Sequence, residues 1–340
     1  MKSIFDYKLD DLIEYFSSID EAAYKAKQVF DWIYKKRVFD FDLMTNLSKE
    51  SREKLKSNLD ISLLTLKKRQ TSEDANKYLF ELSDGNLIEA VLMRHDYGNS
   101  VCVSSQVGCN MGCSFCESGL LHKVRDLMPG EIVRQILMIE SDIKERISSV
   151  VVMGIGEPFD NYDNIMNFIR IINEPLGLAI GARHITVSTS GLIPKIIEYA
   201  NESIQTNLAV SLHAPNNKLR TKIMKINKAY PIEELMSAIK EYNTITKRRV
   251  TIEYILLRDV NDSIKEADEL IELLKGLNVY VNLIPYNETS HIEYKRSDND
   301  TVMKFYDRLK RGGINVTVRR RFGNSIDAAC GQLRANEVNK

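Results

Sequence analysis

Three cysteines stand close together in the run CNMGCSFC, which places Cys109, Cys113 and Cys116 on one short loop. Iron–sulfur clusters are normally held by four thiolates, and structural zinc sites pair one CxxC with a second pair of ligands. This run offers three thiolates, which would leave one iron of a [4Fe-4S] cluster open to bind a small molecule. The alternative is a zinc site that Cys102 or His122 completes.

A glycine-rich run with one carboxylate, Gly154-Ile155-Gly156-Glu157-Pro158, follows a predicted buried strand. Glycine lets the backbone approach a ligand closely, and a carboxylate beside it accepts hydrogen bonds from an amino group. One such motif alone also occurs in ordinary turns. Further candidates for contacts to a small molecule stand where later strands end: Ser188, Ser211, Leu212, His213 and Asn287.

Two more cysteines, Cys102 and Cys330, lie outside the three-cysteine loop. Five cysteines are an odd number, which does not fit a purely structural disulfide framework, and their clustering indicates metal or redox chemistry. A lone cysteine is more often an inert buried side chain than a nucleophile. Because Ala328, Ala329 and Gly331 surround Cys330, its sulfur is expected to be approachable.

From residue 100 onward the sequence alternates strands with amphipathic helices. The predicted helices include 131–143, 232–244 and 264–274, and the predicted strands are VCVSS (101–105), SSVVVMG (148–154), HITVST (184–189), NLAVSLH (207–213), VTIEYILL (250–257) and YVNLIPY (280–286). A seventh strand, INVTVRR, precedes the C-terminal segment. This pattern predicts an α/β fold with a parallel sheet, either a partial barrel or a doubly wound sheet.

The candidate residues favour the partial barrel, because each of them sits where a strand ends. Barrel enzymes build their sites at the carboxyl ends of several strands. The predicted organisation is therefore a small N-terminal helical domain (1–60), a short β hairpin or linker (61–99), a partial (β/α)6 barrel of the TIM type (100–320) and a C-terminal loop that carries Cys330 (321–340).

The bulk composition excludes some classes of protein. The 340 residues are 44% apolar and 28% charged, and no apolar run approaches the roughly 20 residues of a membrane span. The acidic, amphipathic N-terminus does not resemble a secretory signal, so a cytoplasmic protein is expected. Lys plus Arg and Asp plus Glu each number 47, so any surface for nucleic acid must be local. Candidate basic runs, each also explained as a solvated face, are 35–37, 67–69, 247–249 and 319–321.

Taken in order, these motifs resemble the dual-specificity RNA methyltransferase family of radical S-adenosylmethionine (SAM) enzymes. The stretches that carry the resemblance are VCVSSQVGCNMGCSFC, MGIGEPFDNYDNI, ITVSTSG, LAVSLHAPN, RVTIEYILL, NLIPYN and IDAACGQL. The N-terminal run KAKQVFDWIYKKRVFDFDLMTNLSKESREKL is similar to that family's helical accessory domain, so the likeness spans nearly the whole chain.

The resemblance implies two cofactors, a [4Fe-4S] cluster on Cys109, Cys113 and Cys116, and SAM. It implies that SAM contacts Gly156, Glu157, Ser188, Ser211, Leu212, His213 and Asn287. The implied substrates are an adenine of 23S rRNA, met in a protein-poor assembly intermediate, and the adenine just 3′ of the anticodon in tRNA. The other implied partner is a flavodoxin or a ferredoxin-type electron donor, and a monomer is expected.

The family's chemistry also assigns roles to three remaining side chains. C2 of adenine is electron-poor and does not attack SAM directly, so a radical route is needed. Cys330 carries the methyl group as a thioether, Glu89 accepts the C2 proton, and Cys102 attacks Cys330 to release the base.

Three alternatives stay open. A sister family uses the same cysteines to methylate C8 of the same rRNA adenine, which gives antibiotic resistance. A radical SAM enzyme that transfers no methyl group would not need Cys102 or Cys330, and a zinc-bearing RNA-binding module would need a fourth ligand. The sequence departs from the family at Glu117, directly after the third cysteine, where a small neutral residue is usual. This carboxylate either lies near SAM or points to solvent.

Overall fold

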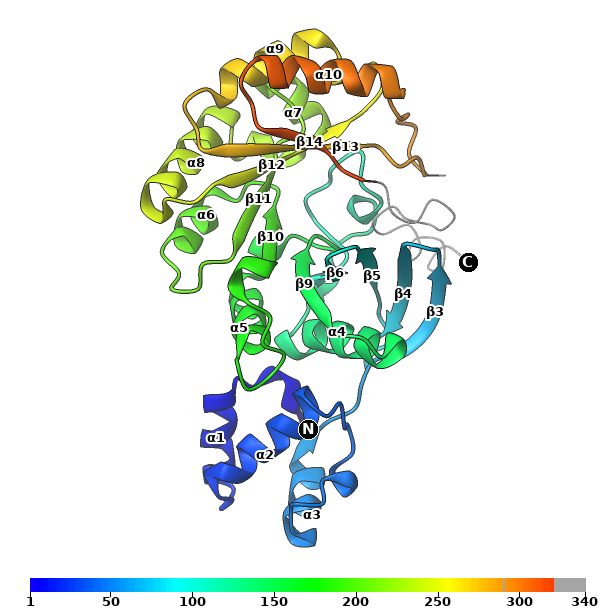
Figure 1. Cartoon of the computed structure of the whole chain (residues 1–340), viewed down its shortest axis with the longest axis vertical. Coiled ribbons are helices and arrows are strands. Elements are labelled where there is room, and N and C mark those ends of the chain that lie inside the picture. Colours follow the sequence, from blue (N-terminus) through cyan, green and yellow to red (C-terminus); the bar gives the residue numbers. More distant parts are fainter. Residues whose placement is uncertain (290, 321–340) are drawn as a thin grey trace.

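A computed structural model describes residues 1–289 and 291–320, and Figure 1 shows their arrangement. One long sheet has the strand order β14-β13-β12-β11-β10-β9-β6-β5-β4-β3. Its strands are β3 (Thr65–Thr71), β4 (Ala75–Glu81), β5 (Leu87–His95), β6 (Gly98–Val103), β9 (Ile147–Val152), β10 (Ile185–Thr189), β11 (Asn207–Ser211), β12 (Val250–Leu256), β13 (Val279–Pro285) and β14 (Val316–Val318).

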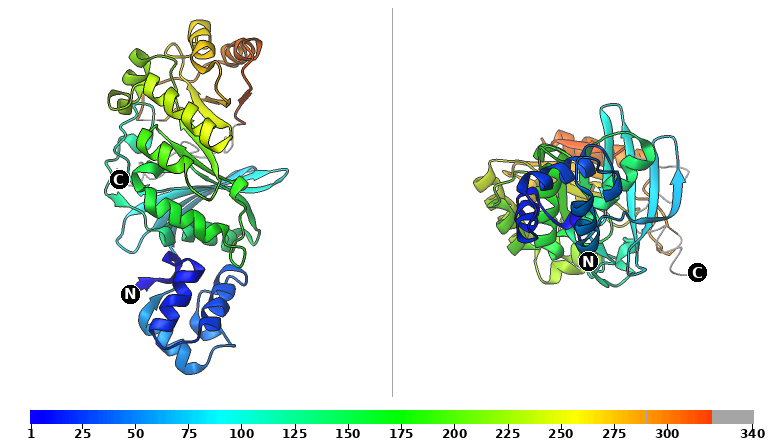
Figure 2. Two further views of the ribbon diagram at one scale, coloured as in Figure 1. Left: turned by 90° about the vertical axis from the view of Figure 1, so that its left-hand side faces the viewer. Right: turned by 90° about the horizontal axis from the view of Figure 1, so that it is seen from below.

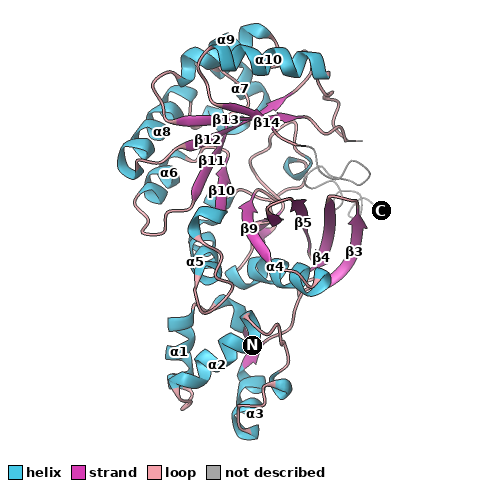
Figure 3. Ribbon diagram, viewed as in Figure 1, coloured by secondary structure: helices cyan, strands magenta, loops and turns pink. Residues whose placement is uncertain are grey.

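From β6 to β14, each strand is parallel to its neighbour in the sheet. Helices connect consecutive strands of this part, as the alternation of colours in Figure 3 shows. They are α4 (Pro129–Ile143), α5 (Tyr162–Asn173), α6 (Ile193–Ala200), α7 (Asn217–Ile223), α8 (Ile232–Thr246), α9 (Ile264–Leu274) and α10 (Asn299–Arg311). The predicted six βα units and the seventh strand are thereby confirmed.

Local sequence explains these elements. The parallel strands are rich in Val and Ile because both of their faces are covered, as in the run ISSVVV of β9. Pro129 begins α4, where its missing N–H costs nothing, and the Met128 N–H donates to Glu131 Oε2 (2.9 Å). A capping box of Ser263 and Glu266 starts α9.

The sheet forms an open barrel in the described part of the chain, with β3 and β14 as its two edges. It curves from β14 at the top of Figure 1 to β3 at the right, and α5, α6, α8, α9 and α10 lie outside the curve. Because β6, β9, β10, β11 and β13 are parallel, their carboxyl ends share one rim, where the predicted site residues follow them.

Residues 61–99 differ from the predicted hairpin or linker. They form three antiparallel strands, β3 to β5, and β5 pairs with β6 along six registered positions from Ala90↔Val103 to His95↔Gly98. This segment therefore extends the barrel sheet itself. Periodicity showed that strands were present, but the pairing of β5 with β6 joins residues that local sequence does not connect.

The first 60 residues form a small helical unit that projects from one end of the barrel (Figure 2). Its elements are β1 (Lys2–Ser3), η1 (Ile4–Asp6), α1 (Leu9–Ser18), α2 (Ala23–Tyr34), η2 (Phe41–Leu43), α3 (Lys49–Asn58) and β2 (Leu59–Asp60). The unit is tied to α4, since the Gly130 N–H donates to Asp6 (2.8 Å) and Arg134 donates to Asp60 (2.6 Å). None of the helices described combines the length and apolar character that a membrane crossing requires.

Candidate active site

The three clustered cysteines lie on a loop that is closed at its base. The short strands β7 (Gln106–Val107) and β8 (Arg125–Asp126) pair on either side of it. Within the loop, the Cys116 N–H donates to the Cys113 carbonyl (3.2 Å) and the Cys109 N–H to the Leu121 carbonyl (3.0 Å). Gly108 has φ +83°, and a Cβ there would lie 2.1 Å from the His122 carbonyl oxygen, so only glycine fits.

The three thiols are buried or half-buried. Burial raises the pKa of Cys109 to about 12 and also raises the pKa values of Cys113 and Cys116. Neighbouring thiols reinforce the effect for Cys109 and Cys113, and the Glu117 carboxylate does so for Cys116. Thiolates form at such a place when a positive metal centre binds them. In the residues described, no three His, Cys, Asp or Glu side chains are close enough to share a single metal ion. An iron–sulfur cluster does not require three side chains around a single metal ion, because each thiolate binds a different iron of the cluster.

Gly156 and Glu157 follow β9 and pack against the start of the cysteine loop. Gly156 has φ +113°, and a Cβ on it would lie 2.6 Å from Ser105 Oγ. The carboxylate of Glu157 accepts hydrogen bonds from the backbone N–H groups of Ser190 (2.7 Å) and Phe159 (3.1 Å), and burial raises its pKa. Glu157 therefore joins the ends of β9 and β10 and retains acceptor capacity for a ligand amino group.

Gln106 is a site residue that sequence reasoning missed. Its side chain is fully buried, its Oε1 accepts the Glu157 N–H (2.8 Å), and its Nε2 donates to Asp126 (2.7 Å) and Asp160 (2.9 Å). One amide thus fixes the glycine-rich run to the cysteine loop. Its place in SSQVGC, just before the first cysteine, was the available signal.

His213 has φ +60° and is buried at the end of β11. Its Nδ1 accepts the Ile255 N–H (3.0 Å), so Nε2 carries the ring proton. Burial, assisted by the charge of Arg220, lowers the pKa of His213 to about 3. The ring meets Phe115 of the cysteine loop edge to face, with 4.9 Å between ring centroids. His213 is thus a neutral hydrogen-bond donor beside the three thiols.

Two polar residues that the sequence did not single out hold the backbone around His213. Asn261 is fully buried and donates to the His213 carbonyl (2.8 Å). Arg220 is also fully buried and donates to the carbonyls of Ser190 (2.6 Å) and Leu212 (3.2 Å). These bonds connect the ends of β10, β11 and β12 into one rigid rim.

Two polar atoms near this rim are buried without a partner among the described residues, Asn287 Oδ1 and Glu117 Oε1. Buried polar atoms are normally satisfied, so unpaired ones at a shared rim indicate a bound group. The polar ends of SAM fit such a site. Ser188 and Ser211 are half-buried at the ends of β10 and β11, and Leu212 is buried beside them.

Glu117 does not point to solvent, so that interpretation of the sequence is wrong. Its side chain is 1% exposed, and its Oε2 lies 3.2 Å from His291 Nδ1. His291 comes from the segment after β13, 174 positions away along the chain. The carboxylate therefore joins the cysteine loop to the segment that also carries Asn287.

A second group of reactive side chains lies where β5 meets β6. Glu89 is buried on β5 and Cys102 lies on β6, with Val91 and Cys102 in register. The Ser104 hydroxyl donates to the Glu89 carbonyl (2.6 Å), which ties β5 to the start of the cysteine loop. Cys330 lies outside the described residues.

Comparison with known proteins identifies the family. The model of the radical SAM superfamily matches residues 103–274, and the model of the ribosomal RNA large subunit methyltransferase N-terminal domain matches residues 2–61. Proteins of Listeria monocytogenes and Streptococcus sanguinis, both named "probable dual-specificity RNA methyltransferase RlmN", are 55% identical over 99% of this chain and cover 95% and 96% of their own lengths. The chain belongs to the RlmN family of radical SAM RNA methyltransferases.

A solved structure agrees with this assignment. The radical SAM methyltransferase from Sphaerobacter thermophilus superposes with a TM-score of 0.95 at 42% identity and covers 98% of this chain and 100% of its own. An RlmN-family enzyme uses a [4Fe-4S] cluster and SAM, so the family decides against the zinc alternative. The predicted fold class, including the helical N-terminal unit, is confirmed.

Proposed function

We propose that this RlmN-family enzyme methylates C2 of an adenine in 23S rRNA and C2 of the adenine just 3′ of the anticodon in tRNA. The observation that carries the proposal is the placement of Cys102 and Glu89 on neighbouring strands directly before the cysteine loop. A radical SAM enzyme that transfers no methyl group has no use for a thiol and a carboxylate there. The relatives' printed name, with its dual specificity, supports the choice of substrates.

In this proposal, Cys109, Cys113 and Cys116 hold the cluster, while Gly156, Glu157, Ser188, Ser211, Leu212, His213 and Asn287 surround SAM. When bound, the cluster and SAM together supply an electron, a methyl group and a hydrogen-abstracting radical. With Nδ1 occupied by the Ile255 N–H, the Nε2–H of the neutral His213 would serve as a donor to SAM, and the Glu157 carboxylate would serve as an acceptor for its amino group. The rigid rim positions SAM by hydrogen bonds that form before it binds.

The remaining roles fall to three side chains. Cys330 carries the methyl group as a thioether, and its methylene carbon joins C2 of the base. Glu89 accepts the proton that C2 loses. The Cys102 thiolate then attacks the sulfur of Cys330, and the S–CH2 bond breaks with its electron pair going to the methylene carbon. That carbon takes up a proton to become the methyl group, so methylated RNA is freed and a Cys102–Cys330 disulfide remains. A flavodoxin or ferredoxin-type protein supplies electrons, and the enzyme works as a cytoplasmic monomer on rRNA in protein-poor assembly intermediates.

The regiochemistry is tested by mapping the modified carbon. Adenosine from 23S rRNA and tRNA of a deletion strain and of a strain complemented with this gene would be separated and fragmented by mass spectrometry. We expect 2-methyladenosine in both RNAs from the complemented strain alone. 8-Methyladenosine would show instead that the enzyme has the sister family's activity, and unmodified tRNA would restrict the substrate to rRNA.

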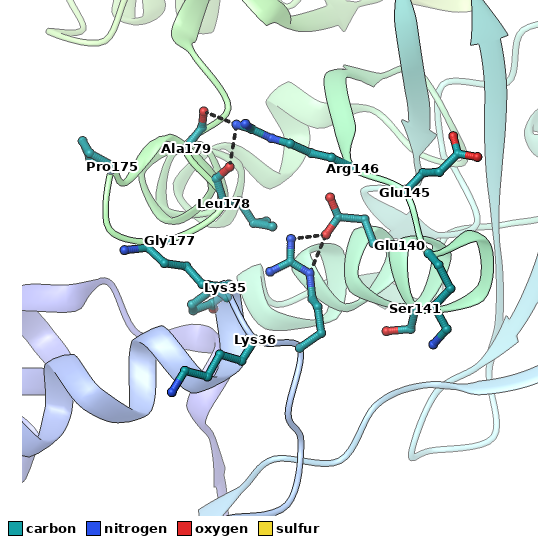
Figure 4. A pocket seen from close by; sticks show the side chains of 13 residues that line it. Lys35, Lys36, Glu140, Ser141, Glu145, Arg146, Pro175, Gly177, Leu178 and Ala179 are labelled. Atoms are coloured by element: carbon teal, nitrogen blue, oxygen red, sulfur yellow. Dashed lines mark hydrogen bonds and ion pairs between the residues drawn. The ribbon is translucent and has the colours of Figure 1, made fainter. Parts of the chain in front are cut away.

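We place part of the RNA contact in a cleft of about 690 Å³ between the N-terminal unit and the barrel (Figure 4). Lys35 and Lys36 line it, and they share the single carboxylate of Asp31 at 3.4 and 3.9 Å. Arg37 is neutralised by Glu140 through a bond of 2.7 Å from its Nε. The two lysines therefore leave surplus positive charge, which suits a phosphate backbone.

Replacing Lys35 and Lys36 together with glutamine is expected to weaken RNA binding and to lower the slope of log K against log salt by about 1 to 2. The cleft is lined by residues that come just before β9 and β10 in the chain, so it lies at the amino ends of these strands and not at the catalytic rim. The substitutions should therefore weaken RNA binding without changing the chemical step, so KM should rise while kcat stays unchanged. The matched control changes Lys265 and Lys275, two exposed lysines at the ends of α9. Equal salt slopes for the two double variants would contradict the placement.

A further inference from the structure

Lys77, in the middle of β4, is a fully buried lysine to which none of the roles above gives a function. Its side chain is 0% exposed, and its Nζ lies 3.0 Å from Oε2 of Glu89, which is itself 4% exposed. Lysine is almost never fully buried unless it is paired. Exchanging such an ion pair for apolar side chains is often neutral or stabilising, so stability alone does not explain it.

The sheet places three reactive groups on one face of three neighbouring strands. Lys77 of β4 is in register with Val91 of β5, and Val91 is in register with Cys102 of β6. Glu89 stands two positions before Val91 and so points to the same face. An ammonium, a carboxylate and a thiol thus line β4, β5 and β6 next to the cysteine loop.

The charges around Cys102 come from each element packed against it. Burial raises the pKa of Cys102, and the Glu89 carboxylate raises it further. The charges of Lys77 and Arg319 and a hydrogen bond from the Met153 backbone lower it. Arg319 directly follows β14, the edge strand of the barrel, so this edge also contributes a positive charge near Cys102. Lys77 and Glu89 thus act on this thiol in opposite directions, with smaller effects than burial and Arg319.

We propose that Lys77 is a positioning residue that orients the Glu89 carboxylate to accept the C2 proton. The inference rests on the proposed role of Glu89. When the proton passes from C2 to Glu89, the bonding pair stays with the base and the carboxylate becomes a neutral acid. The odd electron that radical addition leaves on the base would be taken up by the oxidised iron–sulfur cluster. Neutralising Glu89 then shifts the charge beside Cys102, the next residue to act, toward the positive, because Lys77 lowers the pKa of this thiol and Glu89 raises it. Lys77 thereby couples proton removal to release of the product.

The test compares Lys77→Met, Lys77→Arg and Glu89→Gln in the full-length holoenzyme. Lys77→Met should lower RNA methylation about 100-fold, the scale of general-base catalysis, and should still cleave SAM to 5′-deoxyadenosine. Protein covalently bound to RNA should accumulate, because the blocked step follows carbon–carbon bond formation. Lys77→Arg keeps the charge and should restore most of the rate.

Two readouts separate positioning from a merely structural role. With RNA deuterated at C2, Lys77→Met should show a larger kinetic isotope effect than the unchanged enzyme, since proton removal becomes slow. The second readout is rescue: Lys77→Arg, which keeps a cation beside Glu89, should bring the isotope effect back to that of the unchanged enzyme. The inference would be overturned if Lys77→Met lost methylation only in proportion to its loss of folded protein and if both readouts matched those of the unchanged enzyme.

The Glu89→Gln variant distinguishes failure of this inference from failure of the proposed function. Slow methylation by Glu89→Gln together with normal methylation by Lys77→Met would overturn the role of Lys77 alone. Normal methylation by Glu89→Gln would show that Glu89 is not the proton acceptor. That result would overturn both the proposed role of Glu89 and the inference about Lys77.

Discussion

Replacing Cys113 with alanine is expected to abolish both iron loading and SAM cleavage. Cys113 lies between the other two thiols and takes part in the turn that positions Cys116. Two thiolates cannot hold three irons of a cluster, so the variant lacks one of the three ligands that the loop supplies. Iron and sulfide analysis of anaerobically reconstituted protein, together with the yield of 5′-deoxyadenosine, measures the effect.

The matched control is Cys102→Ala, which removes a thiol outside the cysteine loop. It should load iron as the unchanged enzyme does. Normal iron content in the Cys113 variant would show that the cluster is held elsewhere.

The Cys102→Ala enzyme, in turn, is expected to be isolated with RNA covalently attached through Cys330. If Cys102 releases the methylated base, its loss stalls the reaction after carbon–carbon bond formation and leaves the earlier steps intact. The enzyme then traps its own substrate. Mass spectrometry of nuclease-digested protein should find an adenosine-methylene mass on the peptide that contains Cys330.

Two variants control this experiment. Cys330→Ala should form no adduct, and the double variant without both cysteines should behave in the same way. Free, unmodified Cys330 in the Cys102→Ala protein, with normal release of methylated RNA, would refute the releasing role of Cys102.

Much of the barrel was predictable, because its strands are short apolar runs rich in β-branched residues. The runs VTIEYILL and YVNLIPY match β12 and β13 closely for this reason. The incorporation of residues 61–99 into the same sheet was not predictable. It depends on the register of β5 against β6, and pairing across a sheet leaves no periodic signal in either strand.

In the candidate active site, too, some features were predictable from the sequence and others were not. Cysteine spacing and the run GIGEP stand out in a sequence because they are rare and local. Gln106, Arg220 and Asn261 act through bonds to distant backbone groups, and such bonds have no pattern in the chain. The burial of Glu117 likewise depends on His291, which only the folded segment after β13 brings near. Lys77 appeared as one charged residue in an ordinary strand.

The central claim is that the methyl group reaches the RNA through the S-methyl group of Cys330, and deuterium counting tests it most directly. The enzyme would be supplied with SAM whose methyl group carries three deuterium atoms, and the methylated adenosine would be weighed by mass spectrometry. We expect two deuterium atoms in the new methyl group, because one is removed from the S-methyl group before the carbon joins the base. Three deuterium atoms would mean that an intact methyl group was transferred, which would contradict this account.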